Sequence, residues 1–205
     1  MDASLPKRGP GRPRSFDEAT ALHAAMRCFW AKGYARASID TLSREMQMPR
    51  ASLYAQFGDK DGLFLAAINH YAKTRTGQVI AHLTGQGDAR AEVSGFLGAM
   101  IAMVTADPET PGCLIACVLA EAATAHPEFQ AALADRTAGL EARLYATLLA
   151  ANPLEPQSDL RAKAGVIAST ARGLAVSARA GTSAEDLRAI AQMTVRLTCT
   201  SAHRN

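Results

Sequence analysis

The sequence has few aromatic residues and no long apolar run, and each absence narrows the classes of protein to consider. Phe, Trp and Tyr make up 5% of the 205 residues, although hydrophobic residues as a whole make up 48%. The longest apolar run, Cys113 to Ala120, is far shorter than the roughly 20 residues that span a bilayer. We therefore expect a protein with a real hydrophobic core and no membrane partner.

Other features that would mark a secreted, catalytic or metal-binding protein are also missing. No apolar segment follows the basic residues near the N-terminus, so the sequence does not resemble a secretory signal. Neither a His-Glu-x-x-His motif nor a glycine-rich phosphate loop is present, and the five histidines lack metal-ligand spacing. Four cysteines are too few for a disulfide framework at this length: Cys28, Cys113, Cys117 and Cys199. We predict a cytoplasmic protein that is not an enzyme and has no cofactor and no metal site.

The net positive charge is small overall and is concentrated near the N-terminus. The formal net charge is +3, yet residues 1–60 hold ten Lys/Arg against six Asp/Glu, while the remainder holds twelve against thirteen. Residues 1–14 form a Gly/Pro/Arg arm without apolar periodicity, which we expect to be flexible. Arg12 and Arg14 suit the negative potential of a narrow A·T-rich minor groove. Alternatively, the arm is a solvated tail that adds only nonspecific attraction.

Helical periodicity begins directly after the arm. Ser15 and Glu18 have capping-box spacing, and an apolar stripe with helical spacing follows before Gly33: Leu22, Ala25, Met26, Phe29 and Trp30. Alanine, the strongest helix former, is abundant, and no segment alternates as a strand does. Similar patterns predict further helices over 39–46, 50–57, 60–77, 89–104, 113–125, 127–150, 158–180 and 184–200. The sequence therefore predicts an all-α fold with about nine helices.

The second and third predicted helices are short and joined by a tight turn, which is the pattern of a helix-turn-helix. Here the sequence resembles the TetR family of transcriptional regulators. The resemblance covers about residues 14–65 and lies in these segments: Gly33-Tyr34, Ala37-Ser38-Ile39, the run from Pro49 to Phe57, and Lys60 with Leu63. Beyond residue 65 only length and helical organisation match. The resemblance implies three parts: an arm (1–14), a DNA-binding domain (15–65) and a helical effector-binding and dimerisation domain (66–205).

The resemblance also implies which residues contact double-stranded operator DNA. In the recognition helix they are Arg50, Ala51, Ser52, Tyr54 and Gln56; Arg50 is suited to guanine and Tyr54 to a phosphate. Ser38 and Thr41 can donate to phosphates at the start of the bracing helix, and Lys60 matches the family's phosphate-contacting lysine. Gln47 departs from the pattern, since the family usually has glycine there. A left-handed backbone at Gln47 would cost on the order of 1 kcal/mol.

For the second domain the resemblance implies a small-molecule pocket and a homodimer interface. Flexible methionines beside a few polar groups suit an apolar or aromatic effector of unknown identity, although ordinary core packing is the alternative for each residue. The candidates for the pocket are Phe96, Met100, Met103, Cys113, Cys117, Glu121 and Phe129. Small and apolar residues of the last two helices could pack across a two-fold axis: Gly165, Ala168, Gly173, Leu187, Ile190 and Leu197.

Three functional hypotheses follow. The first is a dimeric repressor that binds a palindromic operator and is released by a small-molecule effector. The second is a redox or electrophile sensor acting through Cys113 or Cys117, because Cys113 is expected at a helix start where the helix dipole would lower its thiol pKa. The third is a small-molecule-binding helical protein without sequence-specific DNA binding.

Overall fold

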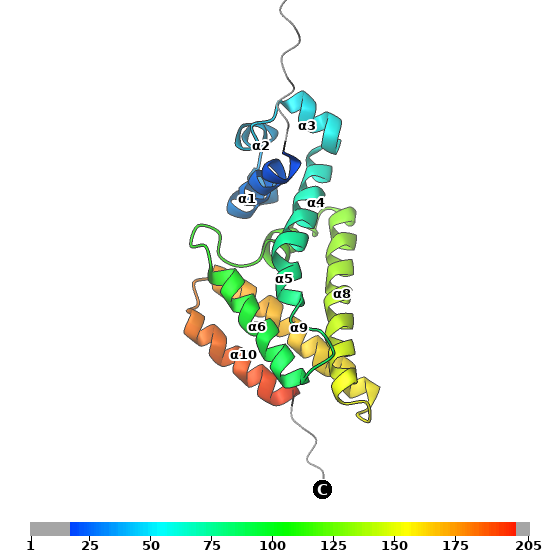
Figure 1. The fold of residues 1–205 in the computed structure, drawn as a ribbon. Coiled ribbons are helices and arrows are strands. Elements are labelled where there is room, and N and C mark those ends of the chain that lie inside the picture. Colours follow the sequence, from blue (N-terminus) through cyan, green and yellow to red (C-terminus); the bar gives the residue numbers. More distant parts are fainter. Residues whose placement is uncertain (1–16, 200–205) are drawn as a thin grey trace, which may run out of the picture.

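The computed structural model describes residues 17–199, which form nine separate helical segments and no strand. The first three helices gather at one end of the molecule, and the remaining helices form a larger body beneath them (Figure 1). This arrangement confirms the predicted all-α fold with an N-terminal helix-turn-helix. No helix within these described residues has the length and apolarity needed to cross a membrane.

The element bounds agree with the predicted helices in most places. Six helices stand alone between loops or turns: α1 (Glu18–Arg36), α2 (Ile39–Glu45), α3 (Arg50–Phe57), α6 (Ala89–Thr105), α9 (Gln157–Arg179) and α10 (Ala184–Thr198). A seventh, α8 (Pro127–Ala151), begins with a proline at its first position, where no backbone N–H is needed. The other two segments each contain a π-helical stretch: α4 (Lys60–Tyr71) continues through η1 (Ala72–Thr76) into α5 (Gly77–Ile80), and η2 (Leu114–Leu119) leads into α7 (Ala120–Ala122).

Helix α1 starts two residues later than the predicted capping box requires. Asp17 is the N-cap, and its carboxylate accepts the backbone N–H of Ala19 at 3.2 Å. The predicted cap at Ser15 is therefore wrong, and Ser15 itself lies outside the described residues. We expected the helix to end at Gly33; instead Gly33 kinks α1, with a φ of 77° in the left-handed region that glycine adopts without strain, and the helix continues to Arg36.

The turn of the helix-turn-helix closes with a Schellman motif, and Gln47 occupies its left-handed position. The backbone N–H of Gln47 donates to Arg44 at 3.1 Å, and that of Met48 donates to Ser43 at 3.0 Å. Gln47 has a φ of 52°, the one non-glycine residue with positive φ in the part of the chain described. The left-handed conformation, whose cost the sequence analysis considered, is thus present at Gln47 although the residue is not glycine.

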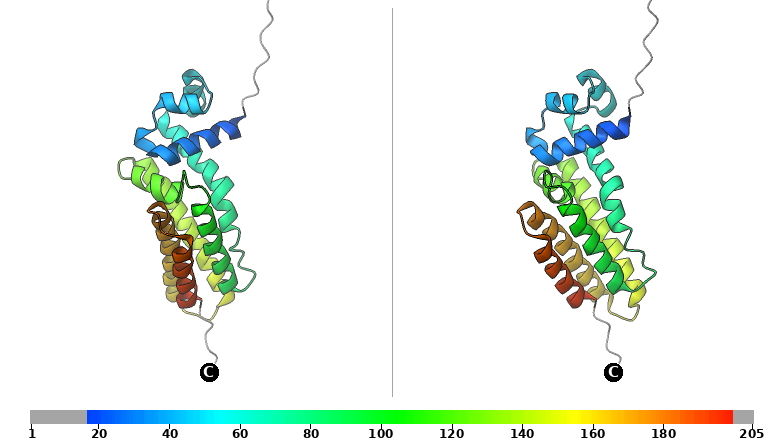
Figure 2. Two further views of the ribbon diagram at one scale, coloured as in Figure 1. Left: turned by 90° about the vertical axis from the view of Figure 1, so that its left-hand side faces the viewer. Right: turned by 60° about the vertical axis from the view of Figure 1, so that its left-hand side comes forward.

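The segment from α4 to α5 is longer than predicted. We expected it to end near Gly77, but it runs to Ile80, because Gly77 keeps a helical φ of −58° and Val79 packs into the core. The π-helical stretch η1 lies in its middle, where the Thr76 hydroxyl donates to the Ala72 carbonyl at 3.2 Å. This one helical segment leaves the end that carries the helix-turn-helix and runs down into the larger body (Figure 2).

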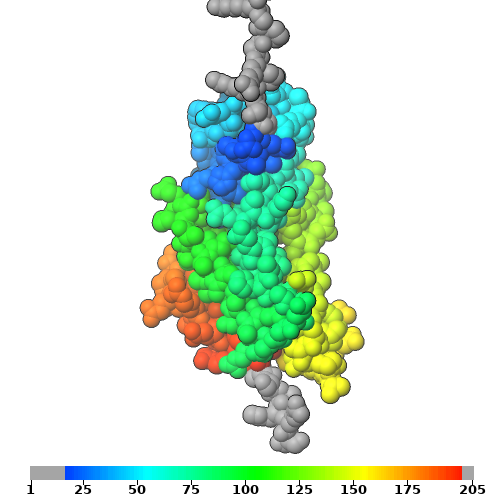
Figure 3. Space-filling model, viewed as in Figure 1, coloured from blue at the N-terminus to red at the C-terminus, as the bar shows by residue number. Residues whose placement is uncertain are grey.

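The larger body is a bundle in which α9 packs against α6, α8 and α10. Helix α10 lies along one side of the bundle, beside α9, and α8 runs along another (Figures 1 and 3). A hydrophobic core continues from the helix-turn-helix into this bundle, with Phe64 and Phe129 among the fully buried side chains. Movements of α4 can therefore be transmitted between the two ends through direct packing.

Candidate nucleic-acid interface and effector pocket

The recognition helix α3 presents its predicted contact residues on the surface. Leu53 is fully buried and fixes the rotation of the helix, while the Tyr54 side chain next to it is 47% exposed. The other four predicted residues of α3 are also exposed: Arg50, Ala51, Ser52 and Gln56. An exposed polar face on a short helix at the end of a molecule is the arrangement in which side chains reach the edges of DNA bases.

Arg50 forms an ion pair with Asp40, which the sequence analysis did not predict. Its Nη2 contacts a carboxylate oxygen of Asp40 in the neighbouring helix α2, and both side chains remain mostly exposed. The pairing holds the guanidinium against the bracing helix. While this pair is formed, fewer of the Arg50 donors are free for another partner.

Ser38 and Thr41 lie together at the start of α2. The Ser38 Oγ accepts the backbone N–H of Thr41 at 3.2 Å and lies 3.0 Å from the Thr41 hydroxyl. Ser38 is exposed and is the N-cap of the helix. Both hydroxyls therefore sit beside the free N–H groups of a helix terminus, which favours a phosphate there.

Lys60 has structural contacts in addition to the predicted role at DNA. Its Nζ donates to the carbonyl oxygen of Ala35 at 3.3 Å and lies 4.3 Å from the centre of the Tyr34 ring. Burial lowers the pKa of Lys60. The side chain thus ties the start of α4 to the end of α1. Arg12 and Arg14 of the arm lie outside the described residues.

A cluster of polar groups joins the DNA-binding end to the bundle, and sequence reasoning missed it. The Tyr34 hydroxyl donates to Asp61 at the start of α4, and His126 Nδ1 lies 3.4 Å from the other Asp61 oxygen. Burial acts to raise the pKa of Asp61, but hydrogen bonds from Tyr34 and Glu128 and the nearby His126 outweigh it and lower the pKa. These groups come from α1, α4 and the start of α8, which are far apart in sequence and carry no motif.

The same cluster bears on the prediction, made from the sequence, that the protein has no metal site. Potential ligand atoms of Asp61, His126 and Glu128 lie within 4.8 Å of one another, although their spacing in the sequence suggests no metal site. In the structure their contacts join the helices that carry them. A second link between the two ends is the ion pair of 2.7 Å between Arg27 in α1 and Asp107 after α6.

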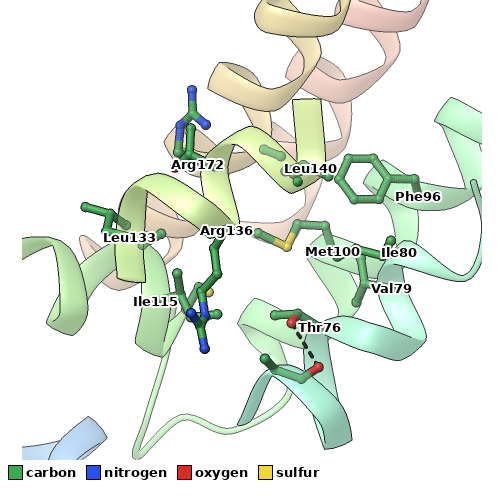
Figure 4. Close-up of a pocket in the computed structure, with 16 residues that line it drawn as sticks. Thr76, Val79, Ile80, Phe96, Met100, Ile115, Leu133, Arg136, Leu140 and Arg172 are labelled. Atoms are coloured by element: carbon green, nitrogen blue, oxygen red, sulfur yellow. Dashed lines mark hydrogen bonds between the residues drawn. The ribbon is translucent and has the colours of Figure 1, made fainter. Parts of the chain in front are cut away.

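An apolar pocket of about 310 Å³ lies between the α4–α5 segment, α6, η2, α8 and α9. Three predicted pocket residues, Phe96, Met100 and Cys113, belong to its wall (Figure 4). The other wall residues are Ala72, Thr76, Val79, Ile80, Ile115, Ala116, Leu133, Arg136, Thr137, Gly139, Leu140, Ala171 and Arg172. No sequence pattern indicated that η1, α5 or α9 contributes to the wall, because their apolar positions look like ordinary core.

The remaining predicted pocket residues do not line this cavity. Phe129 is fully buried among aromatic rings, with ring centres 5.1 Å from Tyr34 and 5.0 Å from Phe64. Met103 instead accepts a contact from the Tyr71 hydroxyl at 3.7 Å. Cys117 directs its sulfur toward the Ala175 carbonyl at 3.9 Å, and Glu121 is exposed on α7. The seven predicted pocket residues, which come from several helices, thus divide among the pocket wall, the core and the surface.

The thiol of Cys113 does not have the environment expected for a reactive cysteine. Cys113 does precede a helical segment, but its side chain is 3% exposed and that segment begins as a π-helix. Burial raises the pKa of the Cys113 thiol, against the lowering effect of a hydrogen bond with Tyr71. The prediction of a lowered pKa at this thiol is therefore wrong, because desolvation outweighs the helix terminus.

Helices α9 and α10 leave apolar side chains on the surface. Ile190, Met193 and Leu197 are 45%, 48% and 70% exposed and recur with helical spacing on α10. Of the residues predicted for a dimer interface, Ile190, Leu197 and Gly173 are exposed and Gly165 is partly buried. Ala168 and Leu187 are fully buried within the chain, so they cannot form part of such an interface; Val166, Val176 and Met193 are exposed instead.

The helix-turn-helix, with an exposed second helix above a larger helical bundle, defines a class: helical DNA-binding regulators. Comparison with known proteins agrees. Residues 21–67 match the family model described as "Bacterial regulatory proteins, tetR family". The TetR family transcriptional regulator CifR, solved as a cysteine mutant with 26-base-pair operator DNA, is 33% identical, with a TM-score of 0.79 over 90% of this chain and 98% of that chain.

Curated relatives point in the same direction. The transcriptional repressor ComR of Escherichia coli is 28% identical over 93% of this chain and 93% of its own length. The repressor BdcR of the same organism is 40% identical over 67 residues, which are 33% of this chain and 34% of that protein. The chain belongs to the TetR family. It is a transcriptional regulator and not an enzyme, as the sequence predicted.

Proposed function

We propose that this protein is a repressor that binds a palindromic operator as a homodimer and leaves it when a small molecule fills the pocket. The observation that carries the proposal is the position of α3. Its polar face projects from one end of the molecule, while a single helical segment connects that end to the pocket. The operator DNA bound by CifR and the repressor function of ComR and BdcR support the same proposal for this chain.

In this proposal, Arg50 reads base edges and Tyr54 contacts a phosphate. Ser52 and Gln56, which lie one turn apart on α3, also contact the DNA. Ser38 and Thr41 hold a phosphate at the start of α2, and Arg12 and Arg14 of the arm bind in the minor groove. Lys60, in the first turn of α4, contacts a phosphate of the DNA backbone. The net positive charge of the first 60 residues favours association with DNA at low salt.

Dimerisation uses the exposed apolar face of α9 and α10. Five large apolar side chains are on the surface of these two adjacent helices: Val166, Val176, Ile190, Met193 and Leu197. Gly173 lies on the same exposed part of α9, where the absence of a side chain permits close helix packing. Two copies related by a two-fold axis would bury these side chains and present two α3 helices to a palindrome.

The pocket controls DNA binding through the α4–α5 segment. Thr76, Val79 and Ile80 from this segment form part of the pocket wall, and its first residues pack against α1 and α3. An effector that fits a shifted position of the segment better than the present one moves the population toward a different spacing of the two reading helices. A non-covalent effector is favoured over thiol modification, because Cys113 is buried with a raised thiol pKa.

Selection from a pool of random double-stranded DNA tests the proposal. The purified full-length protein should enrich a palindrome at moderate salt, and the Arg50→Ala variant should relax the preference at one position in each half-site. If retained DNA shows no common sequence and retention vanishes as salt rises, the protein binds DNA only through its charge, and the proposal is wrong.

A further inference from the structure

The effector pocket contains positive charge without a matching negative charge in its wall. Fourteen of its sixteen lining residues are uncharged, and the remaining two are Arg136 on α8 and Arg172 on α9. No Asp or Glu lines the cavity. Both arginine side chains are only partly buried, so they can stay charged at the edge of the cavity and can pair with an anion that enters it.

Arg136 is the stronger candidate for pairing with an anionic ligand, because its own hydrogen bonds go to uncharged oxygens. Its Nη1 donates to the Ala132 carbonyl at 3.1 Å, and its Nη2 donates to the Asn69 side-chain oxygen at 2.5 Å. Among the residues that the structure describes, the buried Arg136 Nε has no hydrogen-bond partner. Within residues 17–199, no carboxylate forms an ion pair with Arg136.

Arg172, on α9, repeats part of this pattern. Its Nη1 is also buried without a hydrogen-bond partner, but its Nη2 lies 3.5 Å from Glu141. Figure 4 shows the two guanidinium groups pointing in opposite directions, with Arg136 extending past Ile115 on the side where Thr76 lies. Arg136 is therefore the cation available to a molecule within the pocket.

We propose that the effector is a small carboxylic acid with an apolar body, whose carboxylate is held by Arg136 and whose apolar part lies against Phe96, Met100 and Leu140. This inference rests on the proposed function of the pocket and adds the chemical class of its ligand. The planar guanidinium presents parallel N–H donors that match the two oxygens of a carboxylate. The apolar walls exclude a ligand that is polar throughout, since its remaining groups would have no hydrogen-bond partners.

Binding of matched compounds to the DNA-free protein tests this assignment. We would measure octanoate, decanoate and 4-phenylbutyrate by calorimetry, together with the alcohol and the amine of each carbon skeleton. The carboxylates should bind at least tenfold more tightly than the matched alcohols, and the amines should not bind. Equal binding of acids and alcohols, or no binding of any acid, would overturn the proposal.

Substitution of Arg136 separates its charge from its contribution to packing. Arg136→Met keeps a long apolar side chain and should remove the preference for acids over alcohols, whereas Arg136→Lys should retain part of it. Arg188→Met, on the exposed surface of α10 and outside the pocket, is the matched control and should bind acids like the wild type. An unchanged preference in Arg136→Met, with the variant folded as judged by its melting curve, would contradict the assignment.

Measuring DNA binding separately distinguishes the two proposals. A protein that selects a palindrome but binds none of the acids retains the proposed regulatory function and loses the proposed ligand class. A protein that binds the acids with Arg136-dependent preference but selects no DNA sequence retains the pocket assignment and loses the regulatory function.

Discussion

Arg136 on α8 donates to the side-chain oxygen of Asn69 on α4 at 2.5 Å, directly beside the proposed ligand site. The bond connects the pocket wall to the helix that continues to the DNA-binding end. A carboxylate that takes the Arg136 guanidinium competes with Asn69 for the same donors. This competition gives the ligand a different free energy in the two positions of α4, which is the requirement for coupling.

Replacing Asn69 by alanine should therefore separate ligand binding from its effect on DNA. We expect Asn69→Ala to bind the acids as tightly as the wild type or a few-fold more tightly, because Arg136 no longer has to leave a partner. The fold-change in DNA affinity caused by ligand should shrink severalfold. Fluorescence anisotropy with the selected DNA, with and without ligand, measures both, and an unchanged ligand effect would show that coupling takes another route.

The ion pair between Arg50 and Asp40 leads to a prediction of tighter DNA binding. Asp40→Asn removes a negative charge near the phosphates and releases Arg50, so affinity for the selected DNA should rise several-fold at low salt. Glu45→Gln removes the same charge from α2 without touching Arg50 and is the matched control. If the two variants gain equally, the effect is general electrostatics and the pairing of Arg50 has no particular role.

Gln47 offers a stability test of the helix-turn-helix turn. Its left-handed backbone is strained for a residue with a Cβ, so Gln47→Gly should raise the free energy of unfolding by up to about 1 kcal/mol, the gain being reduced by glycine's larger unfolded-state entropy. Gln47→Val should lower it by about 1 kcal/mol, since a branched side chain tolerates this backbone poorly. Gln192→Gly, inside α10, should instead destabilise by about 1 kcal/mol. Chemical denaturation measures all three, and opposite signs at positions 47 and 192 are the expected result.

Glu92 predicts a specific dependence of stability on pH. Burial alone would raise its pKa, but hydrogen bonds from Thr84 and the backbone N–H groups of Gly85 and Gly87 lower it to about 2, from an ordinary value of 4.5. Because the folded pKa is depressed, the stabilisation is complete above pH 4.5 and is lost as pH falls toward 2. Glu92→Gln should cost about 1–2 kcal/mol at pH 7 and progressively less below pH 4.5.

Denaturation of the wild type and Glu92→Gln across this pH range measures the difference in unfolding free energy. Glu121→Gln, on an exposed side chain of α7, is the control and should follow the wild type throughout. A stability difference that stays constant between pH 7 and pH 3 would mean that the charge of Glu92 is not what holds the loop before α6.

The sequence was sufficient to predict features that depend on residues close together in the chain. The helices that Ser38, Asp59, Asp88 and Ser183 cap begin at residues 39, 60, 89 and 184, as the sequence predicted. Local patterns determine these features because the interacting groups lie within a few residues of each other.

Features that depend on tertiary packing could not be predicted in the same way. The contacts of Asp40 with Arg50, Asp61 with His126 and Asn69 with Arg136 join separate helices, and no spacing in the sequence reveals them. The pocket illustrates the same limit. Phe96 and Met100 line it, but Met103 and Phe129 lie in other parts of the core, although all four share an apolar helical pattern.

The most direct test of the account is a titration of the selected palindrome that counts subunits and varies the half-site spacing. Two subunits should bind each palindrome, and inserting about five base pairs between the half-sites should weaken binding at least tenfold, because it turns them to opposite faces of the duplex. Leu197→Asp, on the exposed face of α10, should reduce affinity for the intact palindrome in the same way. Independent binding of single subunits, unaffected by spacing or by Leu197→Asp, would contradict a dimeric operator-binding regulator.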